Sequence, residues 1–148
     1  MSELRLRRRI LGIDLGKARV GVAVSDELGL LAHPLETIPA TSDVAARIAE
    51  IVTAKDIERV VIGLPRHMNG SMGAGAGEAL AFARKLQDRA QCEVTTWDER
   101  LTTMAANRAL RESGRKARNS RTVVDQVAAQ IILQSYLDAT AGGEVEQA

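Results

Sequence analysis

Hydrophobic positions alternate with polar or small ones in the first quarter of the chain, a pattern typical of β-strands. Strands are predicted over residues 9–15, 20–24 and 30–38, with short turns between them. Pro34 indicates an edge strand or a bulge, because proline cannot donate a ladder hydrogen bond. Three consecutive strands joined by short turns predict an antiparallel meander.

The pattern then changes to helical period broken by short apolar runs. Apolar residues recur every three or four positions after a possible cap at Thr41 or Ser42. The predicted elements are a helix up to the low fifties, a strand over 59–64, a glycine-rich loop over 69–77 with a helix to about 89, a strand over 93–97, a helix from Thr102 or Thr103 to about 113, and a helix from Thr122 to about 137.

This order of elements predicts the architecture. Antiparallel strands followed by strand–helix alternation give an α/β fold with a mixed five-stranded sheet flanked by helices. The order matches the ribonuclease H-like fold. A single domain is expected over residues 1–140, and a disordered tail over residues 141–148.

Composition narrows the class of protein. Only 2% of residues are aromatic, too few for a platform that stacks single-stranded bases. Cys92 is the only cysteine, which excludes an intrachain disulfide and a cysteine zinc cluster. No apolar run has transmembrane length, and no secretory signal is evident. These features predict a cytoplasmic protein without a membrane partner.

Positive charge is gathered in two places although the net charge is only +1. One cluster lies in the first nine residues and includes Arg8 and Arg9, and the other covers residues 108–121. Such clusters suggest attraction for a polyanion, the alternative being a frayed tail and a solvated loop.

Asp14 is the most informative residue, because it lies inside an apolar strand. Burying an ionised carboxylate costs several kcal/mol unless something compensates. Gly12 and Gly16 share its face, so we expect open space over the carboxylate, where a metal ion could sit. The alternative is an Asp that pairs with an arginine or accepts hydrogen bonds from the following turn.

Further carboxylates lie in two later segments. Asp98 and Glu99 end the fifth strand, and strand alternation allows only one of them to join Asp14, without deciding which. Both could instead favour the dipole of the following helix. Asp125 has capping-box spacing from Thr122, but it also falls at the margin of an apolar stripe that we expect to face the sheet, made of Val124, Val127, Ala128, Ile131 and Ser135.

Three oxygen ligands from separate segments suit Mg²⁺ or Mn²⁺. Two such ions, about 3.5–4 Å apart, can promote hydrolysis of a phosphodiester. A histidine nucleophile is not favoured, since His33 precedes a proline and His67 lies in a loop without an evident partner.

Two other ligand classes are less well supported. The glycines at 73, 75 and 77 have G-x-G-x-G spacing instead of the dinucleotide fingerprint G-x-G-x-x-G. Residues 13–16, I-D-L-G, resemble a phosphate motif of the actin, Hsp70 and sugar-kinase superfamily, but those proteins enclose ATP between two such domains and this chain has length for one.

Four motifs together resemble the RuvX/YqgF family of ribonuclease H-like nucleases. They are G-I-D-L-G-K-A-R-V-G-V-A-V-S-D at 12–26, V-I-G-L-P at 61–65, D-E-R-L-T-T at 98–103 and D-Q-V-A-A-Q-I-I-L-Q-S-Y-L-D at 125–138. The resemblance implies that Asp14, Glu99 and Asp125 form the acidic, metal-binding and catalytic triad. One departure is Asn69, where the family usually has an acid, and it leaves the role of that acid open.

The resemblance implies two rival substrates, the 5′ end of precursor 16S rRNA and branched DNA cut by a junction resolvase. A module that binds nucleic acid without cutting it is a third possibility. The residues expected to contact nucleic acid are Arg8, Arg9, Lys17, Arg19, Arg100, Arg115, Lys116 and Arg118. A homodimer is also expected, through pairing or packing of the third strand around Leu30, Leu31 and Leu35.

Overall fold

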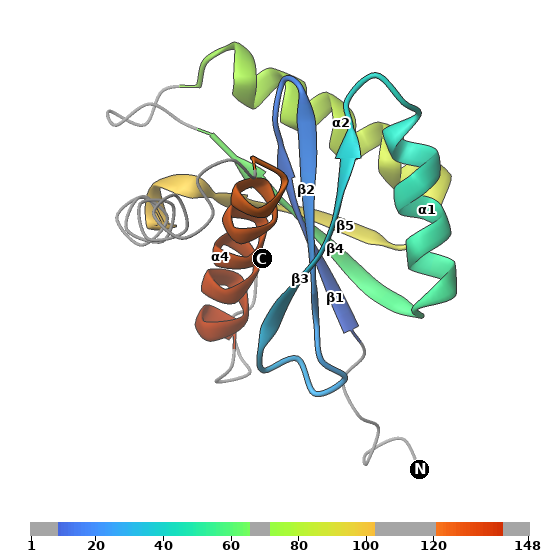
Figure 1. The fold of residues 1–148 in the computed structure, drawn as a ribbon, viewed down its shortest axis with the longest axis vertical. Helices are drawn as coiled ribbons and strands as arrows, with labels where there is room; N and C mark the ends of the chain where they lie inside the picture. The colour runs from blue at the N-terminus through green and yellow to red at the C-terminus, as the bar shows by residue number, and fades with distance from the viewer. Residues whose placement is uncertain (1–8, 66–71, 103–120, 141–148) are drawn as a thin grey trace.

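The computed structural model describes residues 9–65, 72–102 and 121–140 (Figure 1). Its elements follow the predicted order. They are β1 (Arg9–Leu15), β2 (Arg19–Ser25), β3 (Ala32–Pro39), α1 (Val44–Ala54), β4 (Ile57–Leu64), α2 (Ala74–Ala90), β5 (Glu93–Asp98), the short 3₁₀ helix η2 (Glu99–Thr102) and α4 (Arg121–Thr140).

The five strands form one mixed sheet in the order β3-β2-β1-β4-β5. β1 pairs antiparallel with β2, and β2 antiparallel with β3, which confirms the predicted meander. β4 and β5 continue the sheet on the other side of β1 as parallel strands. The mixed α/β sheet predicted from the sequence is therefore confirmed.

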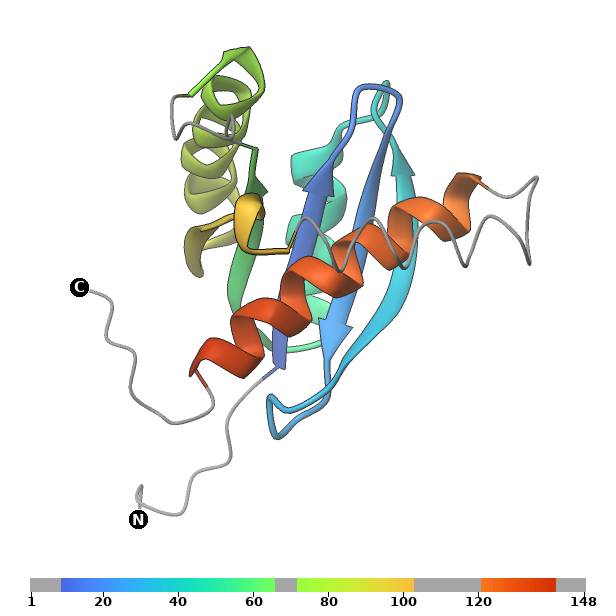
Figure 2. The ribbon, with the colours of Figure 1, turned by 90° about the vertical axis from the view of Figure 1, so that its left-hand side faces the viewer.

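Helices cover both faces of the sheet, as Figure 2 shows in side view. α1 and α2 enclose the larger core on one face, which contains Leu11, Ile13 and Ile62. α4 crosses the opposite face, where Leu133 and Tyr136 pack with residues of β2, β3 and β4 in a second core. Asp14 alternates with Leu11 and Ile13, so its side chain lies on the α4 face.

The prediction of which α4 residues face the sheet was wrong, because the buried stripe begins at other positions of the helix. The buried positions of α4 are Ala129, Ile132, Leu133, Tyr136 and Leu137. Asp125 lies one helical turn before Ala129, which places it on the buried stripe and not at its margin. The shift arises because several apolar side chains of this helix could have faced the sheet, and close approach at Gly12 selected Leu133.

The third strand begins later than predicted, at Ala32. Leu30 and Leu31 precede it and have relative exposures of 52% and 57%. Pro34 lies on an edge strand, and the pairing with β2 shifts there between Val22 and Ala23, so both alternatives expected for this proline are confirmed.

Glutamine side chains of α4 cover the start of this edge strand. Gln134 accepts a hydrogen bond from the Ala32 backbone N–H (2.8 Å) and donates one to the Leu30 carbonyl (3.0 Å). Gln130 donates to the Ala32 carbonyl at 3.0 Å. Side chains of the same chain thus satisfy backbone groups that an edge strand would otherwise offer to another strand.

Several predictions concern segments outside the described residues. These are the helix expected from Thr103 to about 113, most of the glycine-rich loop, the basic stretch after residue 108 and the tail over 141–148. Within the described ranges, no helix is long and apolar enough to cross a membrane.

Candidate active site

The site is built around Asp14, at the carboxyl end of the central strand β1. Asp14 pairs with Gly21 of β2 on one side. On the other side, Ile13 pairs with Ile62 of β4, so Gly63 is the next position beside Asp14. Asp14 therefore lies between two glycines on neighbouring strands, and each glycine leaves room above the sheet.

The Glu99 side chain occupies the room above Gly63. A Cβ atom added at Gly63 would lie 2.5 Å from Glu99 Oε2 and 2.7 Å from Ile132 Cδ1. β5 ends at Asp98, and the 3₁₀ turn that begins at Glu99 brings this carboxylate back over the sheet. A residue larger than glycine at position 63 would push Glu99 away from its place.

Asp125 and the helix that carries it lie over Gly21. A Cβ atom at Gly21 would lie 2.1 Å from the Asp125 carbonyl oxygen and 3.3 Å from Asp125 Cβ. The Asp125 carboxylate accepts a hydrogen bond from Arg19 Nε at 2.7 Å, within an ion pair. The first described turn of α4 is thus held against β2 at this point.

The electrostatics show that the three carboxylates share one neighbourhood. Burial, followed by the negative charge of Asp125, raises the pKa of Asp14 to about 6. Burial, followed by the charges of Asp14 and Asp98, raises the pKa of Glu99 to about 7. Both pKa shifts mean that the ionised carboxylates are destabilised where they lie, first by burial and then by neighbouring like charges.

Asp98 and Glu99 have different surroundings, which the sequence could not distinguish. Asp98 Oδ1 accepts a hydrogen bond from the Arg100 backbone N–H at 2.9 Å, and Asp98 Oδ2 binds Arg100 Nη2 at 2.7 Å. Glu99 is the neighbour that lies over the sheet with Asp14. Glu99 is also the residue that the family resemblance implies as a member of the triad, and that role stays a prediction.

The expected open space beside Asp14 on its own strand was wrong. A Cβ at Gly12 would lie 2.6 Å from Leu133 Cβ, and one at Gly16 would lie 2.5 Å from the Arg19 carbonyl oxygen. Gly12 admits α4 and Gly16 serves the β1–β2 turn. The glycines that make room for acids are Gly21 and Gly63, which sequence analysis did not single out. Their signal was an isolated glycine within a strand pattern.

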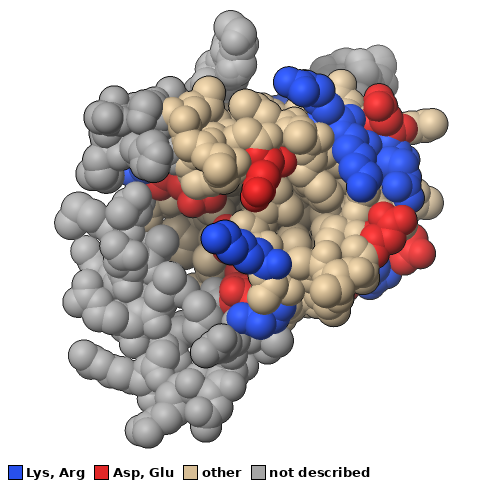
Figure 3. Space-filling view, turned by 90° about the horizontal axis from the view of Figure 1, so that it is seen from above, with Lys and Arg blue, Asp and Glu red and all other residues tan. Residues whose placement is uncertain are grey.

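The basic residues that the structure describes differ in whether they pair with these acids. Lys17 is exposed in the β1–β2 turn, while Arg19 and Arg100 pair with Asp125 and Asp98. Arg9 pairs with Glu27, 3.6 Å away, at the start of β1 and so far from Asp14 along the strand. Figure 3, which views the molecule from above, shows acidic and basic side chains interspersed on this face. Arg8, Arg115, Lys116 and Arg118 lie outside the described residues.

The donor set fits a divalent cation chemically. Asp14 and Glu99 are partly buried carboxylates whose ionised forms are disfavoured, and a cation would offset that cost. Among the described residues, the Asp14 carboxylate accepts no hydrogen bond and forms no ion pair. In the same ranges, no three acidic, histidine or cysteine side chains already stand close enough together to enclose an ion.

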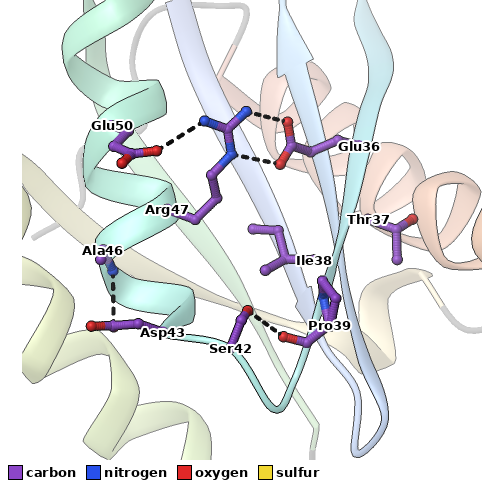
Figure 4. A pocket seen from close by; sticks show the side chains of 9 residues that line it. All are labelled: Glu36, Thr37, Ile38, Pro39, Ser42, Asp43, Ala46, Arg47 and Glu50. Carbon is purple, nitrogen blue, oxygen red and sulfur yellow. Dashed lines mark hydrogen bonds and ion pairs between the residues drawn. The ribbon is translucent and has the colours of Figure 1, made fainter.

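A hollow of about 350 Å³ lies between β3 and α1 (Figure 4). Arg47 spans it and binds Glu36 at 2.7 Å and Glu50 at 3.0 Å. Asp43 caps α1 by accepting a hydrogen bond from the Ala46 N–H, so the cap expected at Thr41 or Ser42 is one or two residues later. The Arg47 guanidinium compensates the charge of the glutamates it binds. This hollow therefore differs from the site around Asp14, where carboxylates lie next to one another.

Comparison with known proteins identifies the family. The family model described as RuvX, Holliday junction resolvase, matches residues 8–139. This chain belongs to the RuvX family. A relative from Acetivibrio thermocellus with the name "Putative pre-16S rRNA nuclease" is 47% identical and aligns with 88% of this chain and 96% of its own length. A relative of the same name from Nocardia farcinica is 46% identical over 96% of this chain and 87% of its own.

Solved structures show which fold this RuvX-family chain shares. Thermus thermophilus RuvC in complex with a Holliday junction substrate aligns with a TM-score of 0.60 at 21% identity, covering 93% of this chain and 98% of RuvC. The fowlpox virus resolvase, bound to junction DNA, aligns with a TM-score of 0.56 at 12% identity, covering 88% and 97%. At such identities the likeness shows the fold alone, and it confirms the ribonuclease H-like fold predicted from the order of elements.

Proposed function

We propose that this protein is a divalent-metal-dependent endonuclease that hydrolyses nucleic-acid phosphodiesters in the cytoplasm. The observation that carries the proposal is the row Gly63, Asp14, Gly21, in which each glycine gives room to a further acid. A fold that needed only stability would not bury carboxylates next to one another, where burial and then like charge raise their pKa values.

Asp14 and Glu99 would hold Mg²⁺ or Mn²⁺, and Asp125 would complete the set of ligands. We expect two divalent ions to bind there. They would activate water and stabilise the leaving oxygen of the phosphodiester. The role of the protein is to fix the carboxylates from three segments on one rigid sheet, with α4 and η2 packed over it. Lys17, Arg19 and Arg100 would attract the phosphate chain, together with the basic segments at 5–9 and 108–121.

The substrate that we favour is the 5′ end of precursor 16S rRNA, processed during ribosome biogenesis. The support is family membership together with relatives at 46–47% identity that bear the name "Putative pre-16S rRNA nuclease". The carboxylates also argue against a module that only binds nucleic acid, because negative charge next to phosphate weakens binding unless a cation intervenes.

A second candidate is a resolvase that cuts branched DNA, the activity given in the description of the matching family model. Two symmetric cuts in a four-way junction require two sites related by a two-fold axis, which would need the predicted homodimer. The exposed Leu30 and Leu31 could pack in such a dimer, whereas the glutamines of α4 already bind the backbone at Ala32.

The test is a cleavage assay with Mn²⁺ or Mg²⁺ on a precursor-rRNA fragment and, in parallel, on a four-way DNA junction. The wild-type protein should cut one of them and lose activity in EDTA. Asp14→Asn should lower cleavage more than about 100-fold, since even outer partners of metal ligands contribute 10–100-fold. The same variant should keep or improve nucleic-acid binding, because a negative charge near phosphate is removed.

Glu93→Gln is the matched control, since Glu93 is an acid 61% exposed at the opposite end of the sheet. It should cut at the wild-type rate. Undiminished cleavage in EDTA would exclude the metal mechanism, and cleavage of neither substrate by a folded wild-type protein would count against both candidates. Light scattering with junction DNA would separate them further, as a strict monomer cannot make paired symmetric cuts.

A further inference from the structure

The Arg19 side chain binds Asp125 through a single hydrogen bond. Its Nε atom lies 2.7 Å from Asp125 Oδ2, and this is the one hydrogen bond between the two side chains. Arg100, in contrast, binds both oxygens of Asp98 through Nε, at 3.2 and 3.1 Å, and adds Nη2 and the backbone N–H. A single hydrogen bond is exchanged more readily than such a fork.

The main chain of each partner is held by a contact with the sheet or its turn, so we expect the pair to separate through movement of the side chains. The Arg19 carbonyl accepts a hydrogen bond from the Gly16 N–H at 3.0 Å, within the tight β1–β2 turn. Asp125 cannot withdraw from the sheet without lifting α4 away from Gly21. The Arg19 and Asp125 side chains are 32% and 23% exposed, which leaves the guanidinium a path toward solvent.

Asp125 also faces an opposing influence, because Asp14 carries charge of the same sign close by. In the absence of a cation, the positive charge of Arg19 is what lies against Asp125. A divalent ion held by Asp14 and Glu99 would be repelled by Arg19 and attracted by Asp125. The Arg19 guanidinium and a bound divalent cation would therefore compete for the Asp125 carboxylate.

We propose that Arg19 is a positioning residue that holds Asp125 in the metal-free protein and gives it up when a divalent cation binds. The proposal rests on the metal site of the proposed function and adds a competition within it. Once released, the Arg19 guanidinium is free to bind a phosphate of the substrate. Cation binding and phosphate binding then favour each other, because each removes the obstacle to the other.

The experiment measures Mn²⁺ binding to the full chain by calorimetry and by electron paramagnetic resonance, without substrate. Arg19→Gln should lower the Mn²⁺ dissociation constant by about tenfold, since a nearby positive charge and a competitor for Asp125 are both lost. Arg19→Lys, which keeps the charge, should stay closer to wild type. Arg59→Gln breaks an ion pair of similar length at the far end of the sheet and should leave the constant unchanged.

Thermal unfolding gives a second readout on the same proteins. Without metal, Arg19→Gln should lower Tm by about 3 °C, because Asp125 loses its partner beside Asp14. Saturating Mn²⁺ should remove this difference, because the cation replaces the arginine. Arg59→Gln should show the same Tm difference with and without Mn²⁺.

Three results would overturn the proposal in distinguishable ways. Unchanged Mn²⁺ affinity in Arg19→Gln would show that Arg19 does not compete for Asp125. Weaker Mn²⁺ binding, with a Tm difference that persists in Mn²⁺, would show that Arg19 holds Asp125 permanently. Absence of any Mn²⁺ binding by the wild type, with no change in Asp14→Asn, would remove the metal site of the proposed function and this inference with it.

Discussion

The two ends of the sheet differ in how their charged side chains are arranged. At the end where β4 and β5 begin, Arg59 binds Glu93 at 2.6 Å and also donates to the Tyr136 hydroxyl. Tyr136 in turn packs edge-on against Trp97, with ring centroids 5.5 Å apart. Arg59 and Glu93 thus carry opposite charges and bind each other. At the end where β1 finishes, Asp14 and Glu99 lie near each other and near Asp125, and burial raises their pKa values.

The contrast separates residues that stabilise the fold from residues held in place by it. An ion pair linked to an aromatic contact adds to stability, although only modestly at a partly exposed site. Crowded carboxylates subtract from it unless a cation is present. Such a cost is typical of sites that are kept for chemistry. The following predictions test whether the two ends differ in this way.

The largest effect is expected from the pair of neighbours at the end of β5. Glu99→Gln should lower cleavage by more than about 100-fold, because a carboxylate facing Asp14 is lost. Asp98→Asn should have a much smaller effect, since Asp98 is directed to Arg100. Cleavage rates measured at saturating Mn²⁺ check this. Equal losses in the two variants would show that the acids act together and that orientation over the sheet is not decisive.

A smaller effect is expected in the pH dependence of stability without metal. The pKa of Asp14 is raised from an ordinary 3.8 to about 6, so the folded state binds its proton more tightly than the unfolded state does. Its stabilising contribution is complete below pH about 4 and is lost as pH rises through about 6. Glu99 acts in the same direction, from 4.5 to about 7.

Asp14→Asn should therefore unfold with a free energy about 1–3 kcal/mol above wild type at pH 8, and close to it near pH 4. Urea denaturation in EDTA at the two pH values measures this difference. Glu93→Gln, at the other end, should not gain stability with rising pH. A wild-type protein that is more stable than Asp14→Asn at pH 8 would show that Asp14 stabilises the fold as an ion.

The smallest effect is expected from glycines that differ in what surrounds them. Gly63→Ala places a Cβ 2.5 Å from Glu99 Oε2, so cleavage should fall about tenfold while stability falls by about 1–3 kcal/mol. Gly77→Ala is the control, since nothing lies within 4 Å of its Cβ in α2. It should raise stability by up to about 1 kcal/mol, as alanine favours the helix, without changing cleavage. Normal cleavage by Gly63→Ala would mean that Glu99 need not stand above this glycine.

The sequence by itself determined the order of elements, and it singled out the candidate residues of the site. Period-two and period-3.6 patterns depend on local geometry, and they predicted the strands and most helices within a few residues. Asp14 stood out because a carboxylate in an apolar strand is costly wherever the strand lies. The four motifs then implied Glu99 and Asp125 as its companions.

Only the tertiary structure decided how these residues meet. Several faces of α4 were apolar enough to pack, and contact with Gly12 set the one that does, so that Asp125 came onto the buried stripe. Glu99 was separated from Asp98 by the turn of η2 and the pairing of Asp98 with Arg100. The room for two acids came from Gly21 and Gly63, on strands far from them in sequence. Local patterns cannot carry this information, because it depends on which strands become neighbours and how closely a helix approaches them.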